Sequence, residues 1–394
     1  MKILIISYFY YPDLSAGSFR TKSLVDILKK YNNSNLDLEV ICSAPNRYKN
    51  YKHKAANKFE KINNVTIRRI NVPNLGNGII SQIIGFSFFS IKLIYIVKKN
   101  NYNIIYATSA KLMTAFLAAL IARTKKIPLY LDIRDLFLDS VEDMFPKIIL
   151  FPIMPVLRKI EKFSFQSATR INLVSKGFKE YFKNKHISDK FSFYSNGIDR
   201  EFLEYFKPQL IKNRVPVNKK MINVLYAGNI GDGQGLEKII PKFSNSLNSK
   251  IKFKIIGSGG KMNHLLKAIK DQNCQNIEIL KPIHREKLLY EYECADILFL
   301  HLNDLKAYEK VLPSKIFEYA ATGKPILAGV KGYAKSFLEE EVKNSYIFKP
   351  CNLEDSLKTF DLIQLGFSDR INFNKKFERN LIMNCFAKEI VSII

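Results

Sequence analysis

The sequence predicts an α/β protein made of two doubly wound domains in tandem. Its 394 residues suffice for two to three domains of roughly 150 residues each. Apolar residues make up 47% of the chain, which is enough to fill hydrophobic cores and excludes a disordered protein. Short apolar runs alternate with amphipathic stretches along most of the chain, as the strands and helices of parallel sheets do.

The first domain is expected over residues 1–205. A helix is expected after Gly17 and another over Leu112–Ala122, between short apolar runs that are typical of buried strands. These runs are Ile3–Tyr8, Leu38–Cys42, Val65–Ile70, Ile104–Ala107, Leu129–Ile133, Ile171–Val174 and Phe191–Tyr194.

A linker is expected over residues 206–221, because this passage is polar, contains two prolines and lacks periodicity. The second domain follows over 222–370, and 371–394 is expected to form a C-terminal helix that packs back on the first domain. The expected strands of the second domain are Val224–Gly228, Phe253–Gly257, Ile277–Leu280, Ile297–Leu300 and Ile326–Val330. In doubly wound sheets ligands bind outside the carboxyl ends of the strands, so a cleft between the two domains is the expected site.

The net charge and the cysteines indicate which classes of partner and which cellular compartment fit this sequence. The net charge of +26 favours nucleic acid, an anionic membrane or a phosphorylated substrate as partner. An AT-rich genome would give the same excess of Lys and Asn and the absence of Trp, so we expect no nucleic-acid partner. The five cysteines are scattered and form no Cys-x-x-Cys pair, which argues against a disulfide framework or a zinc site and fits the cytoplasm.

The string from Pro313 to Gly323 predicts a helix whose first turn binds an anion. Ser314 and Lys315 stand in that first turn, and the ammonium group of Lys315 adds a full positive charge. Glu318 follows three residues later, on the same face of the helix. The pair could therefore bind one molecule, the cation a phosphate and the carboxylate the ribose hydroxyls. A solvated ion pair between the same two side chains is the plain alternative.

Glycines follow strands at three places and suit close approach to a diphosphate. Gly228, Asn229 and Gly231 belong to a glycine-rich turn between a strand and a helix, but the turn lacks the Gly-x-Gly-x-x-Gly spacing of dinucleotide-binding folds. Gly257 ends the next strand, where an ordinary tight turn explains it equally well. Gly17 lies in a similar small-residue loop of the first domain.

Asp132, Arg134 and Asp135 end a strand of the first domain and are expected on the acceptor side of the site. A salt bridge at the strand end accounts for these residues equally well. No Asp-x-Asp motif stands at the end of a predicted strand, so the sequence predicts no metal site.

Two segments are unusually apolar for surface helices, Ile79–Val97 and Pro146–Phe165. Each is either a core helix or an interfacial patch flanked by lysines and arginines, and neither is predicted to span a membrane. In the interfacial reading, Ile83, Phe86 and Phe89 are expected to contact lipid.

These motifs together resemble those of the GT-B glycosyltransferases of family 4 (group 1), over nearly the whole chain. The resemblance is carried by Ser195–Asp199, Tyr226–Gly231, Pro313–Tyr319 and Gly323–Pro325. It is greatest to the WbuB-like L-fucosamine transferase branch of O-antigen and capsule synthesis. The expected fold is therefore GT-B, with two Rossmann-like domains.

The resemblance implies retaining transfer of an N-acetylated amino sugar from a UDP-sugar to a polyprenyl-diphosphate-linked glycan, at the cytoplasmic face of the inner membrane and without metal or cofactor. Glu318 matches the family's ribose-binding glutamate, and Asp135 falls near the acceptor position. The sequence departs from the family at Lys310, where relatives carry a first glutamate, and at Asn229 and Gln234, where relatives carry diphosphate-binding cations. Lys315 would have to supply that charge.

Two other readings remain open at this point. A nucleotide-sugar 2-epimerase of the same fold would need no acceptor. A non-catalytic basic protein that binds membranes or nucleic acid would show salt-dependent binding without consuming sugar.

Overall fold

The computed structural model describes residues 1–13, 15–31, 35–45, 57–73, 79–109, 112–144, 147–182, 188–211 and 220–394. The chain divides into two compact units. Unit 1 consists of Met1–Asn196 and Arg379–Ile394, and unit 2 consists of Gly197–Glu378. Each unit is described by itself.

Unit 1 is built on an eight-stranded sheet in the order β3-β4-β2-β1-β5-β6-β7-β8. All neighbouring strands are parallel except the edge pair β3 and β4. The strands are β1 (Lys2–Ile6), β2 (Asp37–Ser43), β3 (Phe59–Ile62), β4 (Val65–Ile70), β5 (Ile104–Ser109), β6 (Leu129–Ile133), β7 (Arg170–Leu173) and β8 (Phe191–Ser192). The chain order reverses between β1 and β5, so the switch point of a doubly wound sheet lies there.

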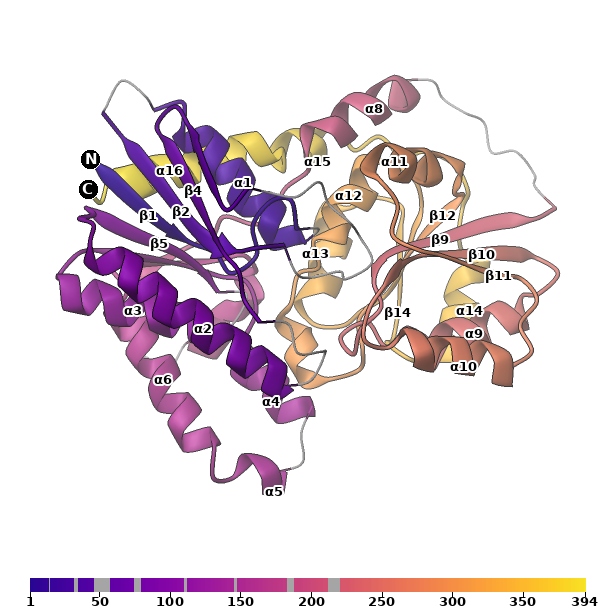
Figure 1. The fold of residues 1–394 in the computed structure, drawn as a ribbon. Helices are drawn as coiled ribbons and strands as arrows, with labels where there is room; N and C mark the ends of the chain where they lie inside the picture. Colours follow the sequence, from indigo (N-terminus) through magenta and orange to yellow (C-terminus); the bar gives the residue numbers. More distant parts are fainter. Residues whose placement is uncertain are drawn as a thin grey trace. The chain divides into compact units, whose positions relative to one another are not determined.

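Helices cover both faces of this sheet, α1 and α16 on one face and α2, α3 and α6 on the other (Figure 1). The helices of unit 1 are α1 (Ala16–Leu28), α2 (Ile79–Lys98), α3 (Leu112–Lys125), α4 (Phe137–Met144), α5 (Lys147–Leu150), α6 (Met154–Ser167), α7 (Lys179–Phe182) and α16 (Arg379–Val391). The strands β1, β5 and β6 are mostly apolar and almost wholly buried, as expected for a sheet covered on both faces, although β6 also buries Asp132.

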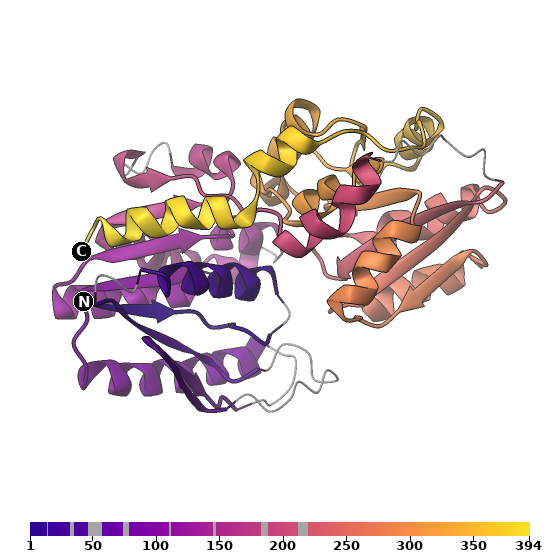
Figure 2. The same cartoon turned by 90° about the horizontal axis from the view of Figure 1, so that it is seen from above.

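The C-terminal helix completes the core of unit 1. Met383 and Phe386 of α16 are fully buried in one cluster with Leu24 of α1 and Ile5 of β1. Figure 2 shows α16 beside α1, with both chain ends at the same end of the unit. The segment 379–394 is therefore a structural part of unit 1, although all of unit 2 precedes it in the chain.

Unit 2 is built on a six-stranded, fully parallel sheet in the order β11-β10-β9-β12-β13-β14. This is the Rossmann order, and its switch point lies between β9 and β12. The strands are β9 (Ile222–Asn229), β10 (Ile251–Ser258), β11 (Ile277–Leu280), β12 (Ile297–His301), β13 (Ile326–Gly329) and β14 (Ser345–Phe348).

The helices of unit 2 also form two layers (Figure 1), with α9, α10 and α14 packed against one face through a shared apolar cluster. The helices are α8 (Arg200–Ile211), α9 (Leu236–Ser246), α10 (Met262–Asp271), α11 (Arg285–Cys294), α12 (Lys315–Ala321), α13 (Tyr333–Glu341), α14 (Leu353–Asp361) and α15 (Ile371–Lys376). The predicted α/β class with two doubly wound parallel sheets is confirmed.

The unit boundary differs from the expected linker. Residues 206–211 continue helix α8, and 212–219 lie outside the described residues. The chain passes from unit 1 to unit 2 between Asn196 and Gly197 and returns between Glu378 and Arg379. Phe202 and Phe206 of α8 are buried, which explains why a polar and charged passage still begins as helix.

Candidate functional site

In unit 2, Lys315 and Gly228 lie against each other at the carboxyl end of β9. A Cβ atom placed on residue 228 would stand 1.8 Å from Nζ of Lys315. Gly228 adopts a φ of +151°, a backbone conformation that side chains strongly disfavour. The ammonium group also lies 5.4 Å from the centre of the Tyr226 ring. The sequence-predicted cation and the sequence-predicted glycine therefore meet beside the switch point of the sheet.

Glu318 lies one turn along α12 from Lys315 and is partly exposed. Its carboxylate accepts a hydrogen bond of 3.2 Å from the hydroxyl of Tyr292. Tyr292 is fully buried, and burial together with the charge of Glu318 raises the pKa of its phenol well above the ordinary value. Tyr292 therefore stays a donor at every physiological pH and fixes the orientation of the carboxylate.

Arg285 brings a second charge near Glu318. Its guanidinium pairs with Asp199 and lies 2.9 Å from the carboxylate of Glu201. Burial alone would lower the pKa of Arg285, but Asp199 and Glu318 raise it above its ordinary value. Asp199 of the Ser195–Asp199 motif thus ties the start of α8 to the start of α11.

The first turn of α12 offers fewer amides than the sequence suggests. The amides of Ile316 and Phe317 donate to the carbonyls of Pro313 and Ser314, each at 3.2 Å. The side chain of Ser314 makes no capping hydrogen bond. These two amides are therefore already used, and the ammonium group of Lys315 supplies the full positive charge at this end.

Asn229 and Gln234, which stand where relatives carry cations, bind each other. The side-chain oxygen of Gln234 accepts hydrogen bonds from the Asn229 amide group at 2.9 Å and from the backbone N–H of Gly231 at 3.2 Å. These side chains hold the glycine-rich turn in shape. They are neutral, so they cannot offset the charge of a diphosphate.

The same turn is anchored to β12 by two buried polar side chains. His301 contacts the carbonyl of Gln234 through Nδ1 at 2.6 Å, and its Nε2 accepts the N–H of Cys351 at 3.0 Å. Asn303 donates to the carbonyl of Asp232 at 2.8 Å. Burial lowers the pKa of His301 to about 4, so the ring is neutral and keeps both contacts at neutral pH.

Gly257 packs against the same strand end. A Cβ at residue 257 would stand 1.8 Å from the carbonyl oxygen of Gly228. Gly257 therefore lets β10 approach β9 where the turn begins, which favours the structural explanation of this glycine over direct contact with a ligand.

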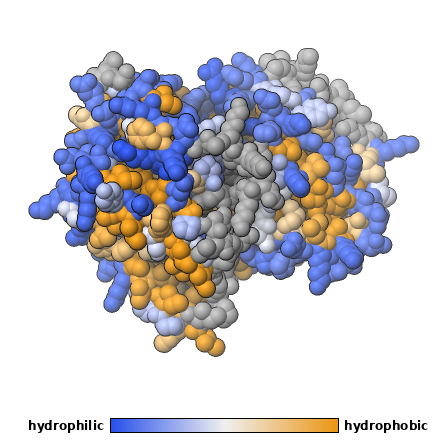
Figure 3. Space-filling model, in the orientation of Figure 1, coloured by the Kyte–Doolittle hydropathy of each residue, from blue (hydrophilic) through white to orange (hydrophobic). Residues whose placement is uncertain are grey.

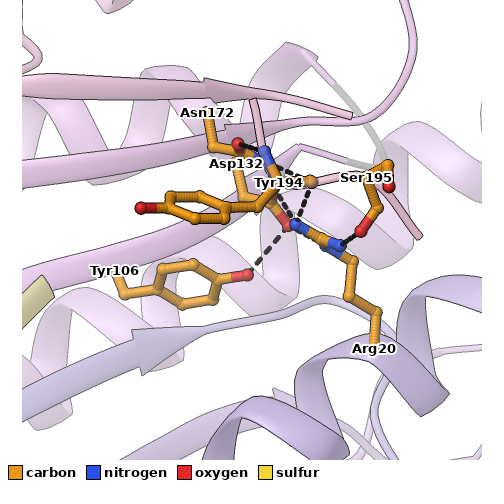
Figure 4. Close-up of polar contacts among 6 residues, drawn as sticks. All are labelled: Arg20, Tyr106, Asp132, Asn172, Tyr194 and Ser195. Atoms are coloured by element: carbon orange, nitrogen blue, oxygen red, sulfur yellow. Dashed lines mark hydrogen bonds and ion pairs between the residues drawn. The ribbon is translucent and has the colours of Figure 1, made fainter. Parts of the chain in front are cut away.

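In unit 1, Asp132 forms the centre of a buried polar network (Figure 4). Arg20 of α1 binds its carboxylate through Nε at 2.9 Å and through Nη2 at 3.1 Å. Tyr106 donates to it at 2.9 Å and Asn172 at 2.7 Å. Burial alone would raise the pKa of the Asp132 carboxyl, but Arg20 and these hydrogen bonds hold it below its usual range.

Arg20 also holds the chain that leaves unit 1. It donates to the carbonyls of Tyr194 at 2.8 Å and Ser195 at 2.6 Å, directly before the boundary at Asn196 (Figure 4). Asp132 is fully buried and surrounded by donors. It is thus placed to position the main chain, and its carboxylate does not reach solvent.

Arg134 and Gly17, which were predicted separately as site residues, lie against each other in the structure. A Cβ at residue 17 would stand 1.6 Å from Nη1 of Arg134. Nε of Arg134 is buried and has no partner among the described residues, and burial lowers the pKa of this guanidinium. Asp135 follows and is exposed, so among the three residues of this strand end it is the one that solvent reaches freely.

A small cavity beside Asp135 contains a residue that sequence analysis missed. The cavity has about 30 Å³ of water-accessible space, enough for one water-sized group. Glu161 of α6 lines it and is almost fully buried, with its carboxylate accepting from the hydroxyl of Tyr181 at 2.7 Å. The available signal was a lone glutamate within an apolar helical segment. The remaining lining residues are Ser109, Leu112, Ala115, Ile133, Leu136, Phe137 and Phe165.

Among the residues that the structure describes, no three His, Cys, Asp or Glu side chains are grouped so that they could hold a metal ion. The expectation that transfer proceeds without metal remains a prediction.

A family model gives the first comparison with known proteins. Residues 209–378, less than half of the chain, match the model for "Glycosyl transferases group 1". The match covers most of unit 2 and includes Lys315, Glu318 and the glycine-rich turn.

Two curated proteins are similar over parts of their length. The chain is 30% identical over 121 residues to the "Putative colanic acid biosynthesis glycosyl transferase WcaI" of Escherichia coli, which covers 31% of this chain and 29% of that protein. It is 23% identical over 242 residues to the "Probable glycosyltransferase WbjE" of Pseudomonas aeruginosa, covering 59% and 60%. The chain thus spans less than two thirds of either relative.

Solved structures share the fold along the whole chain. Anabaena HepE "in complex with UDP and glucose" superposes with a TM-score of 0.65 at 16% identity, covering 100% of both chains. Sucrose-phosphate synthase from Thermosynechococcus elongatus superposes with a TM-score of 0.66 at 13% identity, covering 100% of this chain and 94% of that one. Residues 209–378 therefore match the glycosyltransferase group 1 family, and the chain has the fold of the GT-B glycosyltransferases.

Proposed function

We propose that the chain is a glycosyltransferase that moves a sugar from a nucleotide sugar to a growing bacterial surface polysaccharide. The observation that carries the proposal is the contact of Lys315 with Gly228, with Glu318 one helical turn away. This places one cation and one carboxylate at the carboxyl end of the central strand of a Rossmann-type sheet. A nucleoside diphosphate has matching chemistry, since it carries an anionic diphosphate beside a ribose diol.

The comparisons support this class of reaction. The curated relatives are named as glycosyltransferases, one of them in colanic acid biosynthesis. HepE was solved with UDP and glucose, which favours UDP as the nucleotide here too. We therefore propose a UDP-sugar as donor.

The chemistry proposed for unit 2 is stabilisation of the leaving group. As the bond between the sugar and the diphosphate breaks, negative charge grows on the diphosphate, and the ammonium group of Lys315 lies where it would offset that charge. Glu318, oriented by Tyr292, accepts hydrogen bonds from the ribose. We further propose that the transfer is independent of metal and retains the anomeric configuration, as the family resemblance of the sequence motifs implies.

Unit 1 is proposed to bind the acceptor. Asp135 is exposed at the end of β6 and is the group proposed to orient or deprotonate the acceptor hydroxyl. The sequence motifs resemble those of the fucosamine transferase branch, from which we propose an N-acetylated amino sugar as the transferred group. The same resemblance supports a polyprenyl-diphosphate-linked glycan as acceptor, used at the cytoplasmic face of the inner membrane.

Incubation of the purified protein with a panel of nucleotide sugars and lipid-linked acceptors, followed by mass spectrometry, tests the proposal. We expect one UDP-sugar to give an acceptor enlarged by one sugar, with chelator present, and the Glu318→Gln variant to lose most of this product. Interconversion of the donor without any acceptor would instead establish an epimerase. Salt-dependent binding of acceptor or lipid with no change in any nucleotide sugar would establish a non-catalytic protein.

A further inference from the structure

Helix α2 has two apolar faces, of which only one is used within unit 1. On the inner face, Phe86 and Phe89 pack against the Tyr8 ring, with ring centres 5.7 Å and 5.2 Å apart, and Leu93 and Val97 are buried further along. A helix on the surface of a globular protein normally carries polar side chains on its other face.

The outer face of α2 is apolar as well. Six large side chains on it are exposed, namely Ile80, Ile83, Ile84, Phe88, Ile91 and Tyr95. Their spacing of mostly three and four residues places them along one side of the helix. Two of the expected lipid contacts were therefore wrong: Phe86 and Phe89 belong to the core, and of the three only Ile83 faces outward.

Exposed apolar side chains of α5, of α6 and of the residues between them add to this apolar surface. Ile148 and Phe151 are 89% and 84% exposed, and Ile153 and Val156 follow at the start of α6. Figure 3 shows apolar side chains gathered over α2 and down to α5 on one face of unit 1. We call the exposed apolar side chains of α2, together with Ile148, Phe151, Ile153 and Val156, the apolar face. An exposed apolar patch of this extent marks a surface that binds protein or membrane.

The charged side chains on and directly after helix α2 are positive. Helix α2 contains no acidic residue, and Lys92, Lys98 and Lys99 are exposed at its C-terminal half and end. The ammonium group of Lys99 donates to the Tyr95 hydroxyl at 2.6 Å. Tyrosine and lysine at the end of an apolar stripe are typical of a helix at the boundary of a bilayer. Lys159 and Lys162 of α6 are exposed too, and so is Arg158, whose guanidinium pairs with the carboxylate of Glu142 at 2.9 Å.

We propose that the apolar face docks unit 1 on an anionic lipid bilayer, with α2 lying in the plane of the interface. Apolar side chains would enter the acyl boundary, and the lysines and arginines would contact anionic headgroups. This inference rests on the proposed function for its purpose, because a lipid-linked acceptor stays at the bilayer surface. The geometry of the face itself does not depend on that function.

The structure favours an interfacial helix over a membrane span. The segment Ile80–Lys98 is long and apolar enough to cross a bilayer, and only 28% of it is buried within the protein. Its buried part, however, includes Phe89 and Leu93 in contact with the core of unit 1. Crossing a bilayer would pull these side chains out of the core, whereas docking leaves them in place.

Sedimentation with vesicles of two parts phosphatidylcholine to one part phosphatidylglycerol tests the proposal. We expect the protein to pellet with these vesicles, to stay in the supernatant with pure phosphatidylcholine, and to be released by high salt. The triple variant Ile80→Gln, Ile84→Gln and Ile91→Gln should bind at least roughly ten-fold more weakly, since it removes three apolar side chains from the interface. The variant Lys92→Glu, Lys98→Glu and Lys99→Glu should abolish the preference for anionic vesicles.

Matched controls keep the test falsifiable. Met221→Gln, Leu266→Gln and Leu362→Gln remove three similarly exposed apolar side chains from unit 2 and should leave binding unchanged. Equal losses in both triple variants, each folded by circular dichroism, would overturn the proposal. So would a wild-type protein that stays in solution with anionic vesicles at low salt, including one that forms a dimer which the α2 variant dissociates.

The outcome separates this inference from the proposed function. A protein that binds anionic vesicles but transfers no sugar keeps the docking surface and loses the function. A protein that transfers sugar to an acceptor in solution without binding vesicles keeps the function and loses the docking surface.

Discussion

The ammonium nitrogen of Lys315 occupies the place that a side chain at Gly228 would need. The two residues come from different elements, α12 and the end of β9, and any Cβ at position 228 would stand 1.8 Å from that nitrogen. The positive φ of Gly228 adds a second reason for glycine at this position. A side chain at position 228 should therefore displace the ammonium group of Lys315, so that substituting either residue should have the same effect on transfer.

Replacing Gly228 by Ala should reduce transfer about as much as removing the cation. We expect both Gly228→Ala and Lys315→Ala to lower kcat/KM by roughly 10²- to 10³-fold, the loss typical of one charge-stabilising contact in the transition state. Steady-state kinetics on folded variants measure this. Wild-type kinetics in both variants would show that the donor lies elsewhere.

Glu318→Gln should mainly weaken donor binding. Removing the charge of the acceptor in a hydrogen bond to the ribose should raise the Kd for nucleotide by roughly 10-fold or more. Tyr292→Phe, which leaves the carboxylate but removes its hydrogen-bond donor, should have the smaller effect. Isothermal titration with UDP tests both variants, and an equal Kd for wild type and Glu318→Gln would contradict the assignment.

Asp132→Asn should destabilise unit 1 by about 3–5 kcal/mol, because it leaves the guanidinium of Arg20 buried without its ion-pair partner. Asp135→Asn is the matched control on the same strand end. It is exposed, so its effect on the free energy of unfolding should stay within about 0.5 kcal/mol. Urea denaturation measures both, and a fully stable Asp132→Asn protein would show that the network is dispensable.

Asp135→Asn should impair transfer and leave nucleotide binding unchanged, since Asp135 belongs to unit 1 and the proposed nucleotide site to unit 2. Product formation and UDP titration on the same preparation separate the two effects. Full activity of this variant would support the reading of Asp135 as an ordinary surface carboxylate.

His301 should make unit 2 less stable in mild acid. Its pKa is about 4 in the folded protein against 6.5 ordinarily, so the unfolded chain binds the proton first as the pH falls. The stabilisation is complete above pH 6.5 and is lost progressively between pH 6.5 and 4, by up to about 3 kcal/mol. Urea titrations across this range should show a flatter pH dependence for His301→Gln. An unchanged slope in that variant would contradict the assignment.

Much of the fold could be predicted because buried parallel strands are continuous apolar runs. The wholly buried strand Leu129–Ile133 was predicted to the residue for this reason. Val65–Ile70 and Ile277–Leu280 were also predicted to the residue, although polar side chains alternate with the apolar ones in both. The edge strands β3 and β14 escaped prediction. Phe59–Ile62 carries two charged residues at its centre and is largely exposed, whereas Ser345–Phe348 was missed although it is as apolar as the edge strand Ile277–Leu280. The chain passes between the units at Asn196 and Gly197, where the sequence has no shift in composition like the one that suggested a linker over 206–221.

Site residues could be predicted where they follow a recognisable strand or begin a helix. They could not be predicted where the contact joins segments that are far apart in the sequence. Gly228 and Lys315 each stand next to a recognisable strand or helix end. Arg20 gave no signal, because its partner Asp132 is 112 residues away in the chain. Phe86 and Ile83 could not be assigned to inner and outer faces, since α2 is apolar on both.

Unit 1 is built from two segments that are separated in the sequence by the whole of unit 2, and this determines when its core can be completed during synthesis. On the ribosome, β1 and α1 emerge early, but Met383 and Phe386, which pack against them, are synthesised only after all of 197–378. Until then the core around Leu24 lacks the side chains that α16 contributes. Unit 2, being continuous in sequence, can close its own core first. The unit whose synthesis begins first is therefore the one whose core is completed last.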